Sequence, residues 1–271
     1  CVTDRIDDSV LGVADKRVQL IANYGVGYDH IDVESAKRNG LKVSNTPDVL
    51  TDCTADLAMT LMLMIARRAG EGERSVRENQ WHGWYPTHMM GAKVSGKTLG
   101  IIGMGRIGLA MAEKAHYGFG MKILYHNRSP VKDSSIERMG AKFYEDMEEL
   151  LPQVDFVALH CPGGPVTHHL INAARLSMMK PGSFLINTAR GNVIDETALV
   201  QALQERRIAG AGLDVYEHEP QVNDALKSLD NVVLLPHLGS ATLETRTAMG
   251  MRVLDNLRAW VRGDSLPDQI A

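Results

Sequence analysis

The sequence has few cysteines, no long apolar run and no basic stripe, and each shortage excludes a class of protein. Its three cysteines, Cys1, Cys53 and Cys161, lie far apart, without the spacing of metal ligands or of a disulfide framework. So few thiols fit a reducing compartment, and we expect a cytoplasmic protein. Cys161 follows an apolar run, which favours a buried thiol at a strand end over a reactive one.

No segment predicts a membrane span. The most apolar helical stretch covers residues 58–66 and is bounded by Asp56 and Arg67, whereas a bilayer needs roughly 20 apolar residues. The net charge is −4 and the basic residues form no stripe, which argues against nucleic acid as a partner. A signal-peptide pattern, an internal repeat and a low-complexity tract are also missing.

The pattern that is present is typical of an α/β protein. The length of 271 residues favours two domains. Short apolar runs alternate with helical segments and predict strands at 98–102, 121–125, 156–160, 183–187, 209–215 and 232–235. Strands that are apolar throughout are buried on both faces, which indicates a parallel sheet between layers of helices, the doubly wound arrangement.

The first hundred residues continue the α/β pattern and then change character. They predict strands at 17–22 and 41–45 and helices at 32–39 and 54–69. The stretch 70–95 is polar but carries two tryptophans, Trp81 and Trp84. Because exposed aromatic side chains are unusual on a monomer, we expect this stretch to form a contact between subunits.

A glycine fingerprint follows the strand at 98–102. Gly103 makes a tight turn, Gly105 lets the backbone approach a pyrophosphate, and Gly108 lets a helix pack on the strand. The free N–H groups and dipole at the head of that helix, where Arg106 and Ile107 lie, favour phosphate. A strand, a helix and a second strand surround the glycines, so the pattern predicts dinucleotide binding.

The end of the next strand bears on the choice of cofactor. An NAD-binding strand ends in an acid that holds the ribose 2′-OH, but here Asn127, Arg128 and Ser129 follow and no acid appears before Asp133. A guanidinium suits a 2′-phosphate. We therefore favour NADP(H), with NAD(H) as the alternative if Arg128 is only a solvated charge.

Three polar strings lie at or beyond the ends of the later strands, where the ligand crevice of an open α/β sheet is found. They are Asn187-Thr-Ala-Arg-Gly, Glu217-His-Glu-Pro and Pro236-His-Leu-Gly-Ser. Together with Gly25-Val-Gly and Gly103-Met-Gly-Arg-Ile-Gly, in this order, they make the chain resemble the D-isomer-specific 2-hydroxyacid dehydrogenase family. Within that family it looks similar to glyoxylate and hydroxypyruvate reductases.

The resemblance implies the catalytic residues. Arg190 would hold the substrate carboxylate and carbonyl oxygen, His237 would donate the proton in reduction of a 2-ketoacid, and Glu219 would keep the imidazole protonated. The chemistry agrees, because hydride delivery to a ketone builds negative charge on oxygen and calls for a nearby cation and acid. The adjacent Glu217 competes for the same role, but the family motif places the acid directly before proline, which selects Glu219.

The resemblance carries over further positions more loosely. His237 would also face the cofactor, together with Thr54, Pro162, Thr188, Ala189, Asp214 and Gly239. Residues expected beside the substrate are Val26, Gly27, Leu50 and Trp84. For Trp84 the alternative is packing within a homodimer, the assembly that we expect.

The resemblance also implies the domains. Residues 48–242 would form a Rossmann domain for NAD(P), and residues 1–47 with 243–271 a discontinuous flavodoxin-like substrate domain. Because family members have about fifty more residues before this point, we expect that domain to be N-terminally truncated and incomplete here.

Other readings stay open at this point. His168 and His169 are adjacent, but neighbours on a strand or helix point apart and no carboxylate is in register, so we expect no metal site. NAD-linked oxidation of D-lactate, D-glycerate or 3-phosphoglycerate is an alternative reaction. A dinucleotide-sensing relative without catalysis is an alternative of another class.

Overall fold

The computed structural model describes residues 4–13 and 17–271, so Cys1 lies outside the described residues. The chain divides into a smaller unit, Cys1–Cys53 with Ser240–Ala271, and a larger unit, Thr54–Gly239. The domain boundaries expected from the sequence, after residues 47 and 242, lie a few residues from these. Among the described residues, no helix has the length and apolar character needed to cross a membrane.

The larger unit is built on seven parallel strands in the order β5-β4-β3-β6-β7-β8-β9. Their bounds are β3 (Thr98–Ile102), β4 (Lys122–His126), β5 (Lys142–Tyr144), β6 (Phe156–Leu159), β7 (Phe184–Asn187), β8 (Gly210–Leu213) and β9 (Val232–Leu234). The chain starts this sheet at an interior strand, β3, adds β4 and β5 on one side, and then adds the others on the opposite side. The prediction of a doubly wound parallel sheet is confirmed.

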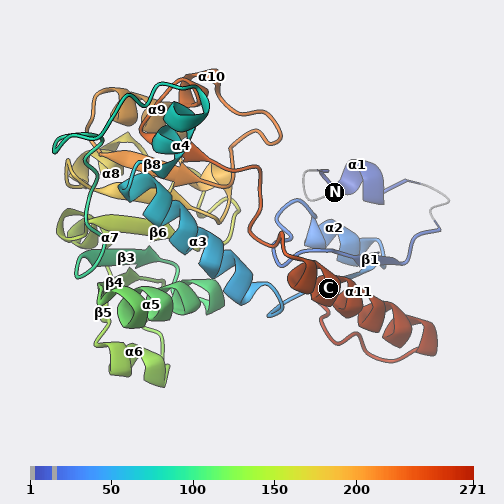
Figure 1. The fold of residues 1–271 in the computed structure, drawn as a ribbon. Coiled ribbons are helices and arrows are strands. Elements are labelled where there is room, and N and C mark those ends of the chain that lie inside the picture. The colour runs from blue at the N-terminus through green and yellow to red at the C-terminus, as the bar shows by residue number, and fades with distance from the viewer. Residues whose placement is uncertain (1–3, 14–16) are drawn as a thin grey trace. The chain divides into compact units, whose positions relative to one another are not determined.

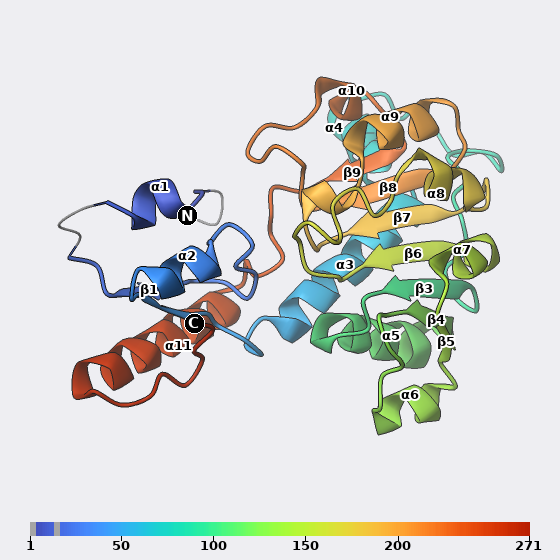
Figure 2. The same ribbon diagram turned by 180° about the vertical axis from the view of Figure 1, so that it is seen from behind.

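Side chains alternate across this sheet and fill two separate cores. In β6, Phe156 and Ala158 join one core, and Val157 and Leu159 join the other. The first core receives helices α3 (Thr51–Ala66), α5 (Arg106–Phe119) and α6 (Ser134–Met139), and Figure 1 is seen from the side of α3 and α5. The second receives α7 (Met147–Leu150), α8 (Ala173–Met178) and α9 (Glu196–Gln204), on the side seen in Figure 2. Burial on both faces explains the continuous apolar runs.

Two elements of this unit were not predicted from the sequence. Helix α4 (Ala69–Arg77) occupies the start of the stretch that the sequence describes as a polar arm, and β5 is an edge strand. None of the residues of α4 is buried, and its nine residues include two glycines and only two larger apolar side chains, Ala69 and Val76, too few to signal a helix. The remaining elements of this unit are α10 (Asp224–Lys227) and the 3-10 helices η1 (Leu151–Gln153) and η2 (Gly191–Val193).

The smaller unit contains a parallel pair of strands, β1 (Leu20–Ala22) and β2 (Lys42–Ser44), with Leu20 opposite Lys42. Its helices are α1 (Asp8–Leu11), α2 (Val33–Arg38) and α11 (Leu243–Arg262). The side chain of Asp32 caps α2, and that of Thr242 caps α11. A small core holds the unit together: Leu11, Ile31, Ala36, Leu41 and Val43. That this unit is part of a flavodoxin-like domain stays a prediction.

Candidate active site

Three loops of the larger unit carry the residues expected to be catalytic. They follow β7, β8 and β9, which are neighbours in the sheet, so their carboxyl ends open on the same edge. Arg190 lies in the first loop, Glu219 in the second and His237 in the third.

The Arg190 loop is shaped by the last residue of β7. The side chain of Asn187 accepts a hydrogen bond from the N–H of Ala189 (2.9 Å) and donates one to the carbonyl of Arg190 (2.8 Å). Gly191 then passes so close to the neighbouring loop that a Cβ there would lie 1.8 Å from the carbonyl carbon of Tyr216. Only glycine fits, and the backbone around Arg190 is therefore fixed against the loop that leads to Glu219.

Asp214 holds the loop that carries His237. Its two carboxylate oxygens accept hydrogen bonds from the N–H groups of Leu238 (2.7 Å) and Gly239 (2.9 Å), and its carbonyl accepts one from His237 N–H (2.9 Å). These bonds keep His237 in the left-handed region, with φ of 56°. Burial raises the pKa of Asp214, and the two N–H groups oppose that rise. This anchoring role was not evident from the sequence.

Glu219 and His237 are in direct contact. Oε2 of Glu219 lies 2.8 Å from Nδ1 of His237, and Oε1 accepts a hydrogen bond from Tyr216 N–H at 3.0 Å. Burial alone would raise the pKa of Glu219, but the bond and charge of His237, the Tyr216 N–H and the charge of Arg190 together lower it. The carboxylate is thus held ionised beside the imidazole.

This contact determines which imidazole nitrogen can exchange a proton. An ionised carboxylate only accepts hydrogen bonds, so Nδ1 of His237 must carry a hydrogen. Nε2 is then the atom able to donate or accept a proton during a reaction. The pair has the arrangement of a general acid held by a carboxylate.

The glycine loop between β3 and α5 meets the steric demands expected of a phosphate cradle. At Gly103, where φ is 97°, a Cβ would lie 2.6 Å from Cys161 N. At Gly108 a Cβ would lie 2.3 Å from the carbonyl oxygen of Gly103, whereas at Gly105 nothing lies within 4 Å. The loop is therefore tightly packed at Gly103 and Gly108 and open at Gly105. Gly105 is the N-cap of α5, where the free N–H groups of the helix are available to a phosphate.

One buried polar atom also fits a bound cofactor. Among the described residues, the hydroxyl of Thr188 is buried without a hydrogen-bond partner, and such groups call for an additional ligand. Thr54, in contrast, is already engaged, since its hydroxyl donates to the carbonyl of Gly239 (3.1 Å). The structure therefore gives Thr54 and Gly239 a contact with each other. Cofactor roles for these residues, and for Pro162 and Ala189, stay predictions.

The segment expected to meet the 2′ position follows β4. Arg128 and Ser129 are exposed, and the side-chain amide of Asn127 donates to the carbonyl of Ser129 (3.2 Å). This bond bends the chain just beyond the strand end. The guanidinium of Arg128 is accordingly presented to solvent at the edge where a Rossmann fold places the adenosine ribose.

The residues expected beside the substrate lie in both units. Val26 and Gly27 belong to the smaller unit, where the amides of Asn45 and Asn23 donate to their carbonyls at 2.9 and 3.0 Å. Leu50 is buried in the same unit. Trp84 belongs to the larger unit and is 79% exposed.

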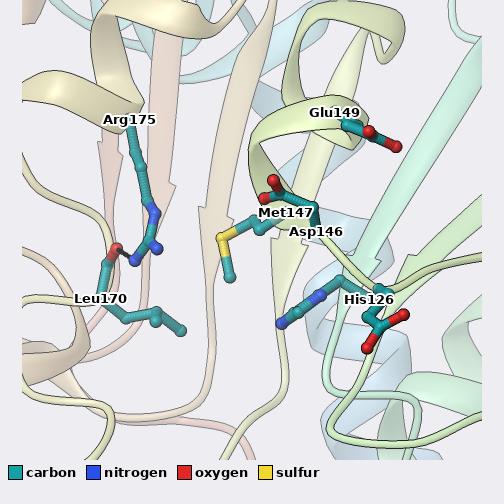
Figure 3. A pocket seen from close by; sticks show the side chains of 7 residues that line it. His126, Asp146, Met147, Glu149, Leu170 and Arg175 are labelled. Atoms are coloured by element: carbon teal, nitrogen blue, oxygen red, sulfur yellow. Dashed lines mark hydrogen bonds between the residues drawn. The ribbon is translucent and has the colours of Figure 1, made fainter.

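A cavity of about 440 Å³ lies in the larger unit, beside the end of β4 (Figure 3). It is lined by His126, Glu145, Asp146, Met147, Glu149, Leu170 and Arg175. The guanidinium of Arg175 donates to the carbonyl of Leu170 (2.7 Å) and lies 3.8 Å from Glu148. Three carboxylates line this cavity and would repel a phosphate, so we do not assign the dinucleotide to it.

A half-buried imidazole, His160, and a buried thiol, Cys161, lie beside the glycine loop at the end of β6. Burial raises the pKa of Cys161 to about 11, so this thiol is buried and unreactive, as expected from the sequence. Burial lowers the pKa of His160 to about 4, and its Nε2 lies 3.0 Å from the sulfur of Met111. The sequence did not point to His160, because a polar residue after an apolar run does not indicate how far its side chain is buried.

The prediction that the side chains of His168 and His169 point apart, with no carboxylate beside them, is wrong. The two residues lie in a turn, where His169 has φ of 50°, and their rings stack with centroids 4.0 Å apart. A carboxylate is also present, since Oε1 of Glu217 lies 2.6 Å from Nε2 of His169. Glu217 thus pairs with His169, and Glu219 with His237.

Comparison with known proteins identifies the family. The model of the D-isomer specific 2-hydroxyacid dehydrogenase NAD binding domain matches residues 59–239, well over half of the chain. The chain belongs to the D-isomer-specific 2-hydroxyacid dehydrogenase family. The family expected from the motifs is confirmed, and with it a nicotinamide dinucleotide as the class of cofactor.

Its relatives in that family include glyoxylate reductases. The glyoxylate reductase of Thermococcus litoralis is 49% identical over 273 residues, covering 99% of this chain and 81% of the relative. That of Pyrococcus furiosus is 49% identical over 270 residues, covering 98% and 79%. The NADPH-dependent glyoxylate/hydroxypyruvate reductase of Sinorhizobium meliloti, crystallised with NADP and malonate, is 41% identical with a TM-score of 0.86, covering 93% of this chain and 77% of that one.

Proposed function

We propose that this family member reduces small 2-ketoacids, glyoxylate and hydroxypyruvate above all, to 2-hydroxyacids with NAD(P)H. The observation that carries the proposal is the 2.8 Å contact between Glu219, in the loop after β8, and His237, in the loop after β9. The Arg190 loop follows β7, the neighbour of β8 in the sheet. An acid held by a carboxylate next to a fixed cation suits reduction of a carbonyl. The names of the relatives point to the same substrates.

Each residue has a task in this reaction. The reduced nicotinamide, when bound, supplies the hydride to the carbonyl carbon. Arg190 binds the substrate carboxylate and stabilises the negative charge that develops on the carbonyl oxygen. His237 donates the proton on Nε2 to that oxygen, and Glu219 stabilises the protonated imidazole until then. In the oxidative direction the same nitrogen accepts the proton.

Within this proposal the cofactor is NADPH in preference to NADH. The proposal is supported by the exposed Arg128 after β4 and by the lack of an acid between His126 and Asp133. A guanidinium binds a phosphate through two parallel hydrogen bonds, and an acid at this place would repel it.

We also infer that two copies of the chain form a dimer through the segment that follows α4. Its exposed apolar side chains support this inference: Trp81 (56%), Trp84 (79%), Tyr85 (55%) and Met90 (67%). Such side chains gather on surfaces that a partner covers.

The test is a turnover assay in which the absorbance of NADPH or NADH is followed with a panel of 2-ketoacids. We expect rapid oxidation of NADPH by glyoxylate and hydroxypyruvate and clearly slower oxidation of NADH. Faster turnover with NADH would retain the reaction and reject the role of Arg128. Dinucleotide binding without turnover of any ketoacid, or of any 2-hydroxyacid in reverse, would favour a sensing protein instead.

A further inference from the structure

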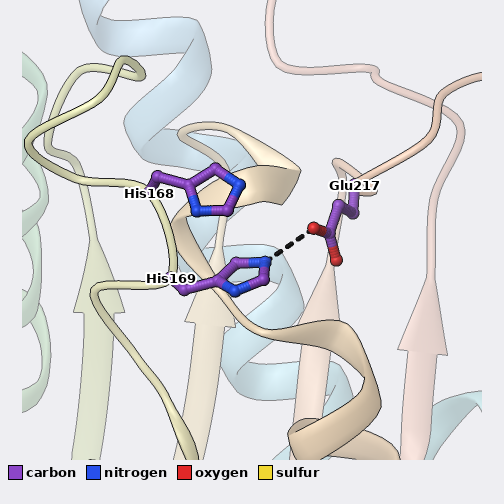
Figure 4. Close-up of side chains that lie close together, drawn as sticks. All are labelled: His168, His169 and Glu217. Carbon is purple, nitrogen blue, oxygen red and sulfur yellow. Dashed lines mark hydrogen bonds and ion pairs between the residues drawn. The ribbon is translucent and has the colours of Figure 1, made fainter.

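A second histidine–carboxylate group lies in the larger unit, apart from the pair expected to be catalytic. It consists of His168, His169 and Glu217, whose ligand atoms all lie within 4.8 Å of one another. Figure 4 shows the two imidazole rings one above the other, with the carboxylate of Glu217 facing them. The proposed reduction uses none of the three side chains.

The backbone holds both segments of this group in place. His169 N–H donates to the carbonyl of Asn192 (2.8 Å), and Ile171 N–H donates to that of Val193 (2.9 Å), so the histidine turn is fixed against η2. On the other side, Glu217 N–H donates to the carboxylate of Glu196 at 3.2 Å. The left-handed backbone of His169 then places its ring against that of its neighbour, which a helix or strand would not allow.

A simple ion pair accounts for only two of the three residues. The contact of His169 with Glu217, 2.6 Å long, explains those two side chains. It does not explain why the ring of His168 lies 4.0 Å from that of His169, with 27° between the ring planes. Imidazole nitrogens are common metal ligands, and here one nitrogen of each ring lies within 4.8 Å of the other and of a carboxylate oxygen of Glu217.

We propose that His168, His169 and Glu217 bind one divalent transition-metal ion of the zinc class. Two imidazoles and a carboxylate suit zinc, whereas magnesium and calcium prefer oxygen ligands only. Zinc bonds of about 2.0–2.2 Å place neighbouring ligand atoms roughly 3.4 Å apart. The group is wide enough for this once the ion replaces the hydrogen bond between His169 and Glu217.

The surroundings also suit an ion that enters from solvent. His168 is exposed and the other two side chains are half-buried. Three protein ligands leave a fourth position for water. Since Glu217 lies in the same loop as Glu219, whose carboxylate accepts the N–H of Tyr216, the ion would stiffen that loop without taking part in the reaction.

The test is a binding measurement that does not depend on activity. The full chain is freed of metal with a chelator, titrated with Co²⁺ under absorption spectroscopy, and titrated with Zn²⁺ by calorimetry. We expect one ion per chain, with visible cobalt bands typical of a tetrahedral site. His168→Ala, His169→Gln and Glu217→Gln should each weaken Zn²⁺ binding by roughly tenfold to a hundredfold or more.

Two control variants locate the ion. His218→Ala removes an exposed imidazole directly beside Glu217, and His237→Ala removes the histidine of the other pair. We expect both variants to bind Zn²⁺ as the parent does. The proposal is overturned if neither ion binds, if binding survives all three ligand variants, or if His237→Ala alone abolishes it. Circular dichroism checks folding, and should His169→Gln unfold, the exposed His168→Ala decides.

Discussion

At the scale of single residues, the pairing of Glu219 with His237 makes the sharpest claim about activity. His237→Ala removes the proposed acid, and Glu219→Gln keeps the size of the side chain but removes the charge that holds the imidazole. We expect each to lower kcat by about 10²–10⁴-fold, the range of general acid catalysis. NADPH binding, followed by nicotinamide fluorescence, should change little.

A matched control separates this effect from a general loss of negative charge. Glu205→Gln alters an exposed carboxylate at the end of α9 that pairs with Arg207. It should retain the parent kcat. A Glu219→Gln variant as active as the parent would show that the carboxylate has no part in turnover.

A second prediction for a single residue concerns the role of Arg128 in the preference for NADPH. Arg128→Gln removes the guanidinium proposed to grip the 2′-phosphate, and loss of a charge-assisted hydrogen bond costs about 1.5–3 kcal/mol. The KM for NADPH should rise by roughly tenfold or more, while the KM for NADH stays unchanged. Arg138→Gln, on the exposed side of α6, is the control. Equal changes for the two cofactors would contradict a specific contact with the phosphate.

At the scale of elements, two glycines of α5 are expected to respond in opposite directions to the same substitution. In Gly108→Ala the new methyl would lie 2.3 Å from the carbonyl oxygen of Gly103, so the glycine loop must shift. We expect a loss of about 1–3 kcal/mol in the free energy of unfolding, and weaker NADPH binding. In Gly118→Ala nothing lies within 4 Å of the methyl, and the helix should gain about 0.5–1 kcal/mol.

Urea denaturation of both variants measures the difference, and because they share one helix, differences in helix context largely cancel. Gly118→Ala also serves as the control for NADPH affinity, which it should leave unaltered. If Gly108→Ala is as stable as the parent and binds NADPH equally well, the tight packing of the loop on α5 contributes neither to stability nor to cofactor binding.

At the scale of the whole molecule, His160 links stability to pH. Burial lowers its pKa from 6.5 to about 4, so the folded chain keeps the ring neutral where the unfolded chain protonates it. The unfolded state therefore binds more protons between about pH 6.5 and 4, and stability present above pH 6.5 is lost as pH falls through that window. The loss attributable to this group is on the order of 3 kcal/mol.

The measurement compares urea denaturation of the parent and of His160→Gln from pH 7.5 to pH 4.5, without cofactor. Other groups titrate in this range, but they contribute equally to both proteins. The variant, which cannot protonate at this position, should lose less stability on acidification. Parallel curves for the two proteins would show that His160 is not held neutral by burial.

Most strands of the sheet, the glycine loop and the family were predictable from the sequence. Strands such as β6 and β7 are apolar throughout, because both of their faces are buried. Such a run can be recognised from a few consecutive residues. The roles of Gly103 and Gly108 can also be recognised from the sequence, because a tight turn and a close helix–strand contact each require a residue without a side chain. The edge strand β5 and the exposed helix α4 lack such a pattern and were missed.

Which side chains meet was not predictable from the sequence and depends on the folded chain. Glu217 and Glu219 are two residues apart, and the fold sends one to His169 and the other to His237. It also gives both carboxylate oxygens of Asp214 to backbone N–H groups near His237. Such contacts join segments tens of residues apart, and their geometry depends on backbone turns like that of His169, which no local periodicity encodes.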